Sequence, residues 1–301
     1  MKKSTFLTAL CLLASSCTPT IDTPDTLDTT DNSAPLTPIT VTVSGFSVEQ
    51  SPFTSTRANE SVTNYGPAKF LTLAFYKTSD GSEVYKHTQE KGNLAEGETF
   101  GNFSTALAIG SYTMVALCND GNNATTLTSP TSATFGDSNV KETLVATQSV
   151  NITNNNALPL SVTLERVVAA LAVKSTDIRP AEVTKMRFTF YAGSKSFNPS
   201  TGYATSDDGF VCLVGLGDKS IGTTTNVGSY LFLASDEENV NVTIDMLNAD
   251  GDVLFCKTAD NVPLKRNRAT VLKGAVYSNT SVTANTFEIG SDWLPDLEKD
   301  F

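Results

Sequence analysis

Apolar residues recur at every second position, or in short unbroken runs, along almost the whole chain, and helical spacing is nearly absent. Period-two alternation is typical of half-buried β-strands, whose side chains point to opposite faces of a sheet. Turn-forming clusters such as Ser79-Asp80-Gly81 and Ala249-Asp250-Gly251 separate the runs. The second cluster divides VNVTIDML from DVLFC, which predicts a hairpin.

The pattern predicts an all-β chain with many short strands. Such a chain folds as a sandwich or a barrel, and the strand number and chain length favour sandwiches. Residues 121–143 are polar, and a short helix or a long loop are the alternatives there. The predicted strands are 39–46, 70–76, 100–108, 111–118, 144–152, 160–163, 167–175, 185–191, 209–215, 229–233, 240–247, 253–256 and 269–276.

The amino terminus has the charge, core and small-residue order of a secretory signal. Lys2 and Lys3 precede the apolar run FLTALCLLA, and Ser15-Ser16-Cys17 follows it. Small residues directly before a cysteine resemble a bacterial lipoprotein signal, which implies cleavage after residue 16 and acylation of Cys17. Acyl chains on one residue hold a soluble domain on a membrane.

A stretch rich in threonine, aspartate and proline follows this cysteine. It has too few apolar residues to offset the entropy of ordering, so residues 17–37 are predicted to be a disordered stalk. About 260 residues remain, enough for two sandwich-sized cores. The asparagine cluster at 151–160 interrupts two apolar strands and suggests an amino-terminal domain over 38–160 and a carboxy-terminal domain over 161–301.

The composition argues against nucleic acid as a partner and against most catalytic schemes. The net charge is −11, whereas binding to phosphates rests on lysine and arginine. The only histidine, His87, lies in a polar segment, and no nucleotide or nucleophile motif occurs. The expectation is no enzyme, no metal and no cofactor, although two acids on distant loops could form a glycosidase site that sequence does not reveal.

The remaining cysteines, Cys118, Cys212 and Cys256, each stand in an apolar run, which predicts small buried core residues. A disulfide between Cys212 and Cys256 is the alternative, because an exported compartment permits it. Trp293, the only tryptophan, is interpreted as a packing anchor rather than a carbohydrate platform.

Four features in order resemble the fimbrillin superfamily of Bacteroidetes surface lipoproteins. They are the lipoprotein start with its stalk, FSTALAIGSYTMVALCNDG at 103–121, LERVVAALAVKSTD at 164–177 and VPLKRNRATVLKGAVYS at 262–278. The resemblance implies two tandem β-sandwich domains of transthyretin-like Greek-key type in a fimbrial (pilus) subunit. Asp25-Thr26-Leu27 and Asp28-Thr29-Thr30 also look like O-glycosylation sites of exported Bacteroidetes proteins, at Thr26 and Thr29.

The mechanism that the resemblance implies is β-strand exchange. An arginine-specific protease would cut the Arg57-Ala58 bond, which follows a first strand with Ile39, Val41 and Val43 on one face. Phe46 and Val48 have the opposite parity, so Gly45 is predicted to form a bulge. The vacated groove would accept a strand from the next subunit by β-augmentation.

The donor strand would come from residues 281–301. Val282 and Ala284 are out of phase with Phe287 and Ile289, and Pro295 follows. This departure from an alternating donor favours a tip or anchor subunit over a shaft subunit, and an anchor would keep both its lipid and its first strand.

The expected role is therefore adhesion or biofilm formation at the outer membrane, on the cell surface and in the fimbrium. The expected partners are other fimbrial subunits, the membrane through the lipid, and host or bacterial surface ligands. The alternative is a surface glycan-binding lipoprotein of a polysaccharide-uptake system. Such a binder should show several aromatic residues on loops, whereas this chain has one tryptophan and mostly strand-patterned phenylalanines.

Overall fold

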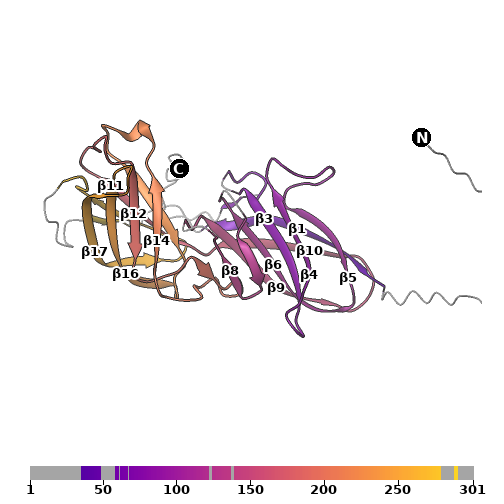
Figure 1. Cartoon of the computed structure of the whole chain (residues 1–301). Coiled ribbons are helices and arrows are strands. Elements are labelled where there is room, and N and C mark those ends of the chain that lie inside the picture. Colours follow the sequence, from indigo (N-terminus) through magenta and orange to yellow (C-terminus); the bar gives the residue numbers. More distant parts are fainter. Residues whose placement is uncertain are drawn as a thin grey trace, which may run out of the picture. The chain divides into compact units, whose positions relative to one another are not determined.

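The computed structural model describes residues 35–48, 58–60, 62–66, 68–121, 124–136, 139–278 and 288–290 (Figure 1). Within these ranges the chain is all-β, as the alternation predicts, and the single helical element is the 3₁₀ turn η1 (Asp218–Ser220). The described part contains no helix long and apolar enough to cross a membrane.

The first sheet holds eight strands from the amino-terminal half of the chain. Its path runs β2-β1-β10-β9-β6-β3-β4, and β5 pairs with β1 beside this path. β1 and β10 are parallel, and the other pairs are antiparallel. The strands are β1 (Thr37–Val48), β2 (Ala58–Glu60), β3 (Phe70–Lys77), β4 (Glu83–Glu90), β5 (Asn102–Leu107), β6 (Gly110–Asn119), β9 (Thr143–Ile152) and β10 (Leu158–Arg166).

The strand β3, next to the edge strand β4, is apolar on both faces because a core covers each of them. Leu71, Leu73 and Phe75 pack in a core built from β1, β3, β5, β6, β9 and β10, so the sheet closes over its own apolar face. Ala74 and Tyr76 point the other way, into a separate core with Phe197 and Phe232. A strand buried on both sides reads as a continuous apolar run rather than as an alternation.

The described residues between 121 and 143 form neither the short helix nor the long loop that their polarity suggested. They contain β7 (Thr126–Ser129) and β8 (Ser132–Thr134), which pair as a hairpin and join β13 (Ser196–Phe197) in a three-stranded sheet. Leu127 and Ala133 are the apolar residues that this hairpin buries in the core with Tyr76. Two strands this short give no sequence period to detect.

The second sandwich packs two four-stranded sheets around one core. Its longest hairpin, β16–β17, turns at Asn248–Asp252, and Gly251 takes a φ of 93° there, as the Ala249-Asp250-Gly251 signal predicts. One sheet has β15 (Asn226–Leu231), β11 (Ala169–Ser175), β18 (Ala269–Gly274) and β19 (Glu288–Gly290), and the other has β14 (Phe210–Gly215), β12 (Lys185–Phe190), β16 (Glu237–Leu247) and β17 (Val253–Lys265).

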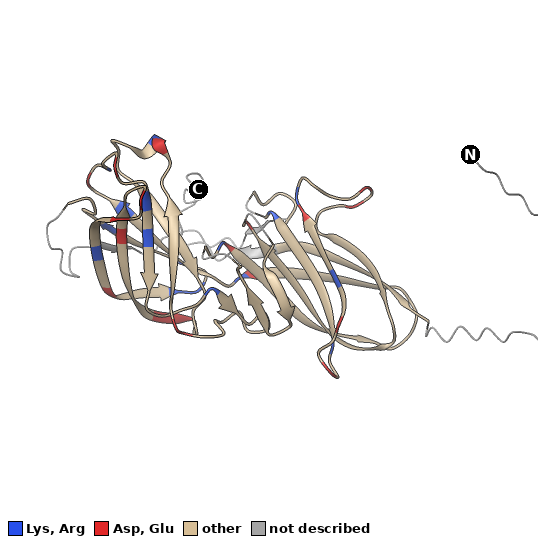
Figure 2. Cartoon of the chain, in the orientation of Figure 1, with Lys and Arg blue, Asp and Glu red and all other residues tan. Residues whose placement is uncertain are grey.

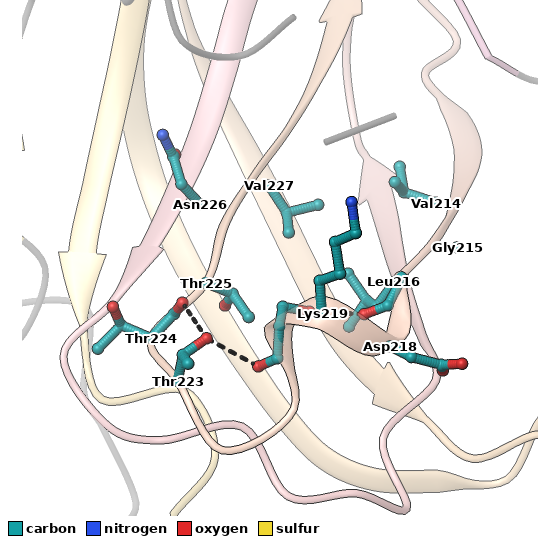
Figure 3. Close-up of a pocket in the computed structure, with 12 residues that line it drawn as sticks. Val214, Gly215, Leu216, Asp218, Lys219, Thr223, Thr224, Thr225, Asn226 and Val227 are labelled. Carbon is teal, nitrogen blue, oxygen red and sulfur yellow. Dashed lines mark hydrogen bonds between the residues drawn. The ribbon is translucent and has the colours of Figure 1, made fainter. Parts of the chain in front are cut away.

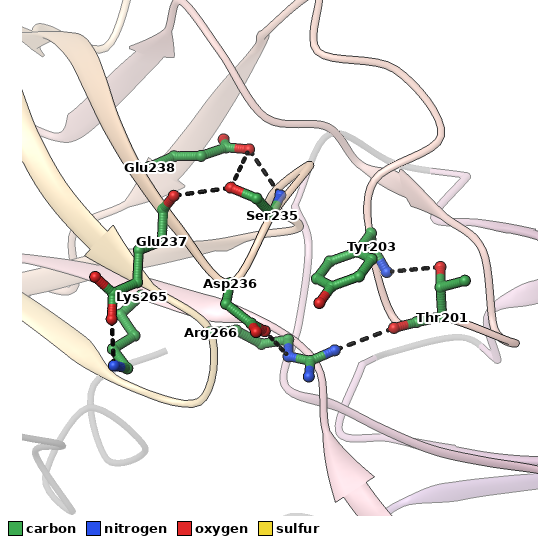
Figure 4. Close-up of polar contacts among 8 residues, drawn as sticks. All are labelled: Thr201, Tyr203, Ser235, Asp236, Glu237, Glu238, Lys265 and Arg266. Carbon is green, nitrogen blue, oxygen red and sulfur yellow. Dashed lines mark hydrogen bonds and ion pairs between the residues drawn. The ribbon is translucent and has the colours of Figure 1, made fainter.

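Polar contacts tie the turns at one end of this sandwich together (Figure 4). The Arg266 guanidinium donates to the Asp236 carboxylate at 3.1 Å and to the Thr201 carbonyl at 3.1 Å, and it lies 4.9 Å from the centre of the Tyr203 ring. Lys265 pairs with Glu237 nearby. These pairs are partly exposed, so each one adds little to stability.

The division into domains at residue 160 stays a prediction. β10 extends from Leu158 to Arg166 and keeps residues 161–166 in the first sheet. Val167 and Val168, which follow it, join the core that contains Tyr76 and Phe232. Residues 35–301 cluster as one compact unit.

Candidate strand-exchange site

β1 has a hydrogen-bonded neighbour on each side along its length. β10 pairs with it in parallel from Ile39↔Leu158 to Ser47↔Glu165. On the other side, β5 pairs with residues 37–42 and β2 pairs with residues 46–48. Removing β1 would therefore open a groove between β10 and the two strands opposite it.

The side chains of β1 alternate strictly between core and solvent over its first half. Ile39, Val41 and Val43 are 1%, 0% and 3% exposed, whereas Thr40 and Thr42 are exposed. Full burial of an aliphatic side chain contributes about 1.5–3 kcal/mol. β1 carries no charged residue (Figure 2), so its loss would uncover apolar core rather than ion pairs.

The pairing changes register in the middle of β1, as the Gly45 signal predicts. Val43 pairs with Val162 and Gly45 with Thr163, so Ser44 is the additional residue. The Val43 amide donates to the Gly101 carbonyl at 2.8 Å. Gly101 has a φ of 92°, and a Cβ there would lie 2.8 Å from Val62 Cγ1, so glycine is required beside the bulge.

β2, directly after the predicted cleavage site, pairs only with β1, but the residues that follow it make contacts outside β1. Val62 and Ala68 are 1% exposed and belong to the first core. The Tyr65 hydroxyl donates to Glu142 Oε1 at 2.6 Å, and Lys91 donates to the Tyr65 carbonyl at 2.8 Å. These contacts would hold Val62, Tyr65 and Ala68 in place if β1 left, whereas β2 would lose its strand partner.

Tyr65 belongs to a buried polar cluster with Glu142, Arg166 and Asn267. The Glu142 and Arg166 side chains are 1% and 2% exposed and form an ion pair. Arg166 also donates to the Tyr65 hydroxyl at 2.9 Å and to Asn267 Oδ1 at 3.1 Å. Burial and the Glu142 charge raise the pKa of Tyr65, so its hydroxyl stays protonated.

Asn267 stands in the turn between β17 and β18 with a φ of 59°, in the left-handed region. The cluster thus joins Tyr65, which follows the predicted cleavage site, to the end of β10 and to the Asn267 turn of the second sandwich. Arg166 and the Asn267 turn lie in sequence stretches that resemble the fimbrillin superfamily, at 164–177 and 262–278. Tyr65 and Glu142 lie in no such stretch, and their spacing in the sequence does not indicate a shared site.

Several predicted site residues lie outside the described residues. These are Cys17, Thr26, Thr29, Arg57 and Trp293. Ala58 is described and is the first residue of β2. Of the predicted donor segment 281–301, the structure describes 288–290, which form β19 and pair with β18 from Val271↔Gly290 to Lys273↔Glu288.

Cys212 and Cys256 form no disulfide with each other. Cys118 and Cys212 are buried, as predicted, and the Cys212 thiol donates to Asn139 Oδ1 at 3.0 Å. The prediction was wrong for Cys256, which is exposed. It lies on β17 opposite Asp245 of β16, on the outer face of its sheet, although it ends an apolar run.

No cluster of three or more histidine, cysteine or acidic side chains that could hold a metal ion occurs among the described residues. His87 Nε2 lies 2.6 Å from Glu98 Oε1 at the partly exposed edge strand β4. Hydrogen bonds from the Ala95 amide and from His87 lower the pKa of Glu98 below its usual value. This contact is an ordinary surface hydrogen bond between a carboxylate and an imidazole.

A cavity of about 510 Å³ lies under the connection between β14 and β15 (Figure 3). Val214 and Val227 form its apolar wall, and Thr223 donates to the Ser220 carbonyl at its rim. Arg179, which is 1% exposed, fixes this connection through the Gly217 carbonyl at 2.6 Å. Residues 214–220 and 223–227 line the cavity, so β1 takes no part in it.

A family model described as a family of unknown function (DUF6562) matches residues 36–293. The chain belongs to this family. The match starts just before β1 and includes the buried cluster and both sandwiches. No curated protein matches it.

Solved structures similar to this DUF6562 chain include fimbrial and adhesion proteins. The fimbrial anchor protein Mfa2 from Porphyromonas gingivalis is 13% identical, with 84% of this chain and 95% of that one covered and a TM-score of 0.47. A candidate cell adhesion protein from Bacteroides ovatus is 16% identical, with 87% and 99% covered and a TM-score of 0.48.

The tip fimbrial protein Mfa3 from Porphyromonas gingivalis, with a carboxy-terminal truncation, is 12% identical, with 86% and 100% covered and a TM-score of 0.38. At such values a likeness does not carry a function from one protein to another. A role for the chain has to be argued from its own residues.

Proposed function

We propose that the chain is a fimbrial subunit of a Bacteroidetes cell surface that acts in adhesion and assembles by exchange of its first strand. The observation that carries the proposal is the position of β1. An uncharged strand with three buried aliphatic residues lies between β10 and the pair β5 and β2, and it precedes the segment that contains Arg57.

Cleavage after Arg57 would release β1 without unfolding the rest. The contacts of Val62, Tyr65 and Ala68 keep the following segment on the core, and Ala58 would become the new amino terminus. What remains is a sandwich with one strand missing, whose unpaired edges and open core favour the addition of a strand from another subunit.

The lipid on Cys17 completes the proposal. It would bring the chain to the outer membrane, and the stalk would separate the folded part from the bilayer. Because cleavage after Arg57 removes both Cys17 and β1, a processed subunit would be free of the membrane and ready to accept a strand. An uncut subunit would keep its anchor and its closed core.

The test compares the wild type with Arg57→Ala and Arg57→Lys in the native host, and the lysine variant keeps the charge while removing the arginine bond. Amino-terminal sequencing and unheated denaturing gels should show a start at Ala58 and a multimer ladder for the wild type. Both variants should give lipidated monomers that start at Cys17. Undiminished ladders from the variants would contradict the cleavage step.

A further inference from the structure

The two sandwiches share one strand topology. Each has a first strand that is parallel to one partner and antiparallel to another: β1 pairs in this way with β10 and β5, and β11 with β18 and β15. The row β4-β3-β6-β9 of the first sandwich likewise matches the row β14-β12-β16-β17 of the second. Residues 216–225, which connect β14 to β15, are therefore the counterpart of residues 91–101, which connect β4 to β5.

The two connections differ in what they place in the core. Residues 91–101 add Leu94 and Phe100 to the first core, and Phe100 is 4% exposed. Residues 216–225 contain two large apolar residues, of which Leu216 packs against the second core while Ile221 is 39% exposed. Since protein interiors are close-packed, the missing side chain leaves the cavity of about 510 Å³ between the edge strands β14 and β15.

Arg179 holds this connection in place from behind the cavity lining. Its guanidinium donates to the Gly217 carbonyl at 2.6 Å, to the Leu216 carbonyl at 3.4 Å and to the Ser220 hydroxyl. These acceptors are neutral oxygens, so they leave the positive charge of the buried guanidinium uncompensated. The cavity is thus preformed, which lowers the entropic cost of binding, and its floor favours an anion over a cation.

The polar groups of the lining are mostly used within the fold. The Thr223 hydroxyl donates to the Ser220 carbonyl at 3.0 Å, and the Thr225 hydroxyl lies 2.6 Å from the Tyr277 hydroxyl. Lys219 is different, because its ammonium has no hydrogen-bond or ion-pair partner among the described residues. In Figure 3 its side chain extends between the two valines of the wall, whereas the neighbouring Asp218 points away from them.

We propose that this cavity binds a free fatty acid of medium chain length, with its hydrocarbon chain against Val214 and Val227 and its carboxylate at Lys219. The volume lies in the range of about 300–1,000 Å³ that is usual for small-molecule pockets. An acidic sugar fits less well, because the hydroxyls of Ser220, Thr223 and Thr225 are already bonded within the fold. The proposal does not depend on strand exchange, since β1 lines no part of the cavity.

The first experiment titrates the mature full chain with octanoate in a calorimeter. Octanoate should bind saturably with one molecule per chain. Octanol, which has the same chain without the charge, should bind at least about tenfold more weakly, because a hydrogen bond to a charged group contributes about 1.5–3 kcal/mol. Glucuronate, an acidic sugar, should not bind. Absence of saturable octanoate binding, or tighter binding of octanol or glucuronate, would overturn the proposal.

The second experiment assigns the binding to this cavity with three variants. Lys219→Met keeps the apolar length of the side chain, so it should weaken octanoate binding about tenfold and leave octanol binding unchanged. Val227→Phe fills the cavity from its wall and should abolish binding of both probes. Lys77→Met, which changes an exposed lysine at the end of β3, is the control and should bind as the wild type does. Equal octanoate affinity in the wild type and Lys219→Met would place the carboxylate elsewhere and refute the assignment.

Discussion

Replacing Glu142 with glutamine tests whether the buried cluster holds the segment behind the cleavage site. Glu142 Oε1 accepts hydrogen bonds from the Arg166 guanidinium and from the Tyr65 hydroxyl, and the two charged side chains are 1% and 2% exposed. Glutamine keeps the shape but removes the charge, so the buried Arg166 cation has no counter-charge in the cluster. Breaking one partner of a buried ion pair costs about 3–5 kcal/mol.

At roughly 2–4 °C per kcal/mol for a folded region of this size, this loss corresponds to a fall in melting temperature of about 6–20 °C. The assay is thermal and urea unfolding of the mature chain followed by circular dichroism. The matched control is Glu237→Gln, which breaks the exposed pair with Lys265 and should cost no more than about 1 kcal/mol. Similar small losses from both variants would refute the assignment of stability to the cluster.

Two further predictions concern glycine and cysteine positions. Gly209→Ala should destabilise the fold far more than Gly251→Ala in the same unfolding assay. A Cβ at Gly209 would lie 2.2 Å from the Phe190 carbonyl oxygen, whereas a Cβ at Gly251 would meet open space and only the strain of a left-handed φ, which costs about 1–2 kcal/mol. Equal losses of stability in the two variants would contradict this packing. Iodoacetamide should label Cys256 in the folded chain but not Cys118 or Cys212, and slowly, because partial burial and a hydrogen bond with Asp245 raise the pKa of the Cys256 thiol. Mass spectrometry of peptides would show this, and labelling of Cys118 in the folded state would contradict its burial.

The sequence predicts strands well where one face is buried, and β1 and the β16–β17 hairpin are examples. It misses β4, whose residues EVYKHTQE are mostly exposed at the edge of a sheet and show no apolar period. β17 extends to Lys265, well past the predicted end at residue 256, and its second half buries Ala259, Val262 and Leu264. A register shift between Val240 and Val242 of β16 interrupts the alternation there. An apolar alternation appears in the sequence only where one face of a strand is buried. A strand such as β4, which is held mainly by backbone pairing, shows no such alternation.

The candidate site divides in the same way. The three buried residues of β1 follow from alternation, and the bulge follows from Gly45. The cluster of Tyr65, Glu142 and Arg166 could not be predicted, because its members are far apart in sequence and meet only after β10 and the loops beside it have folded.

The parallel pairing of β1 with β10 sets a direction for any assembly built through this groove. A replacement strand has to run the same way as β10 to meet the same partners, so every junction along a fibre would have the same orientation. The two ends of such a fibre would then differ: one would present an open groove, and the other a carboxy-terminal strand with no acceptor. Growth and capping would be chemically distinct events, each confined to its own end.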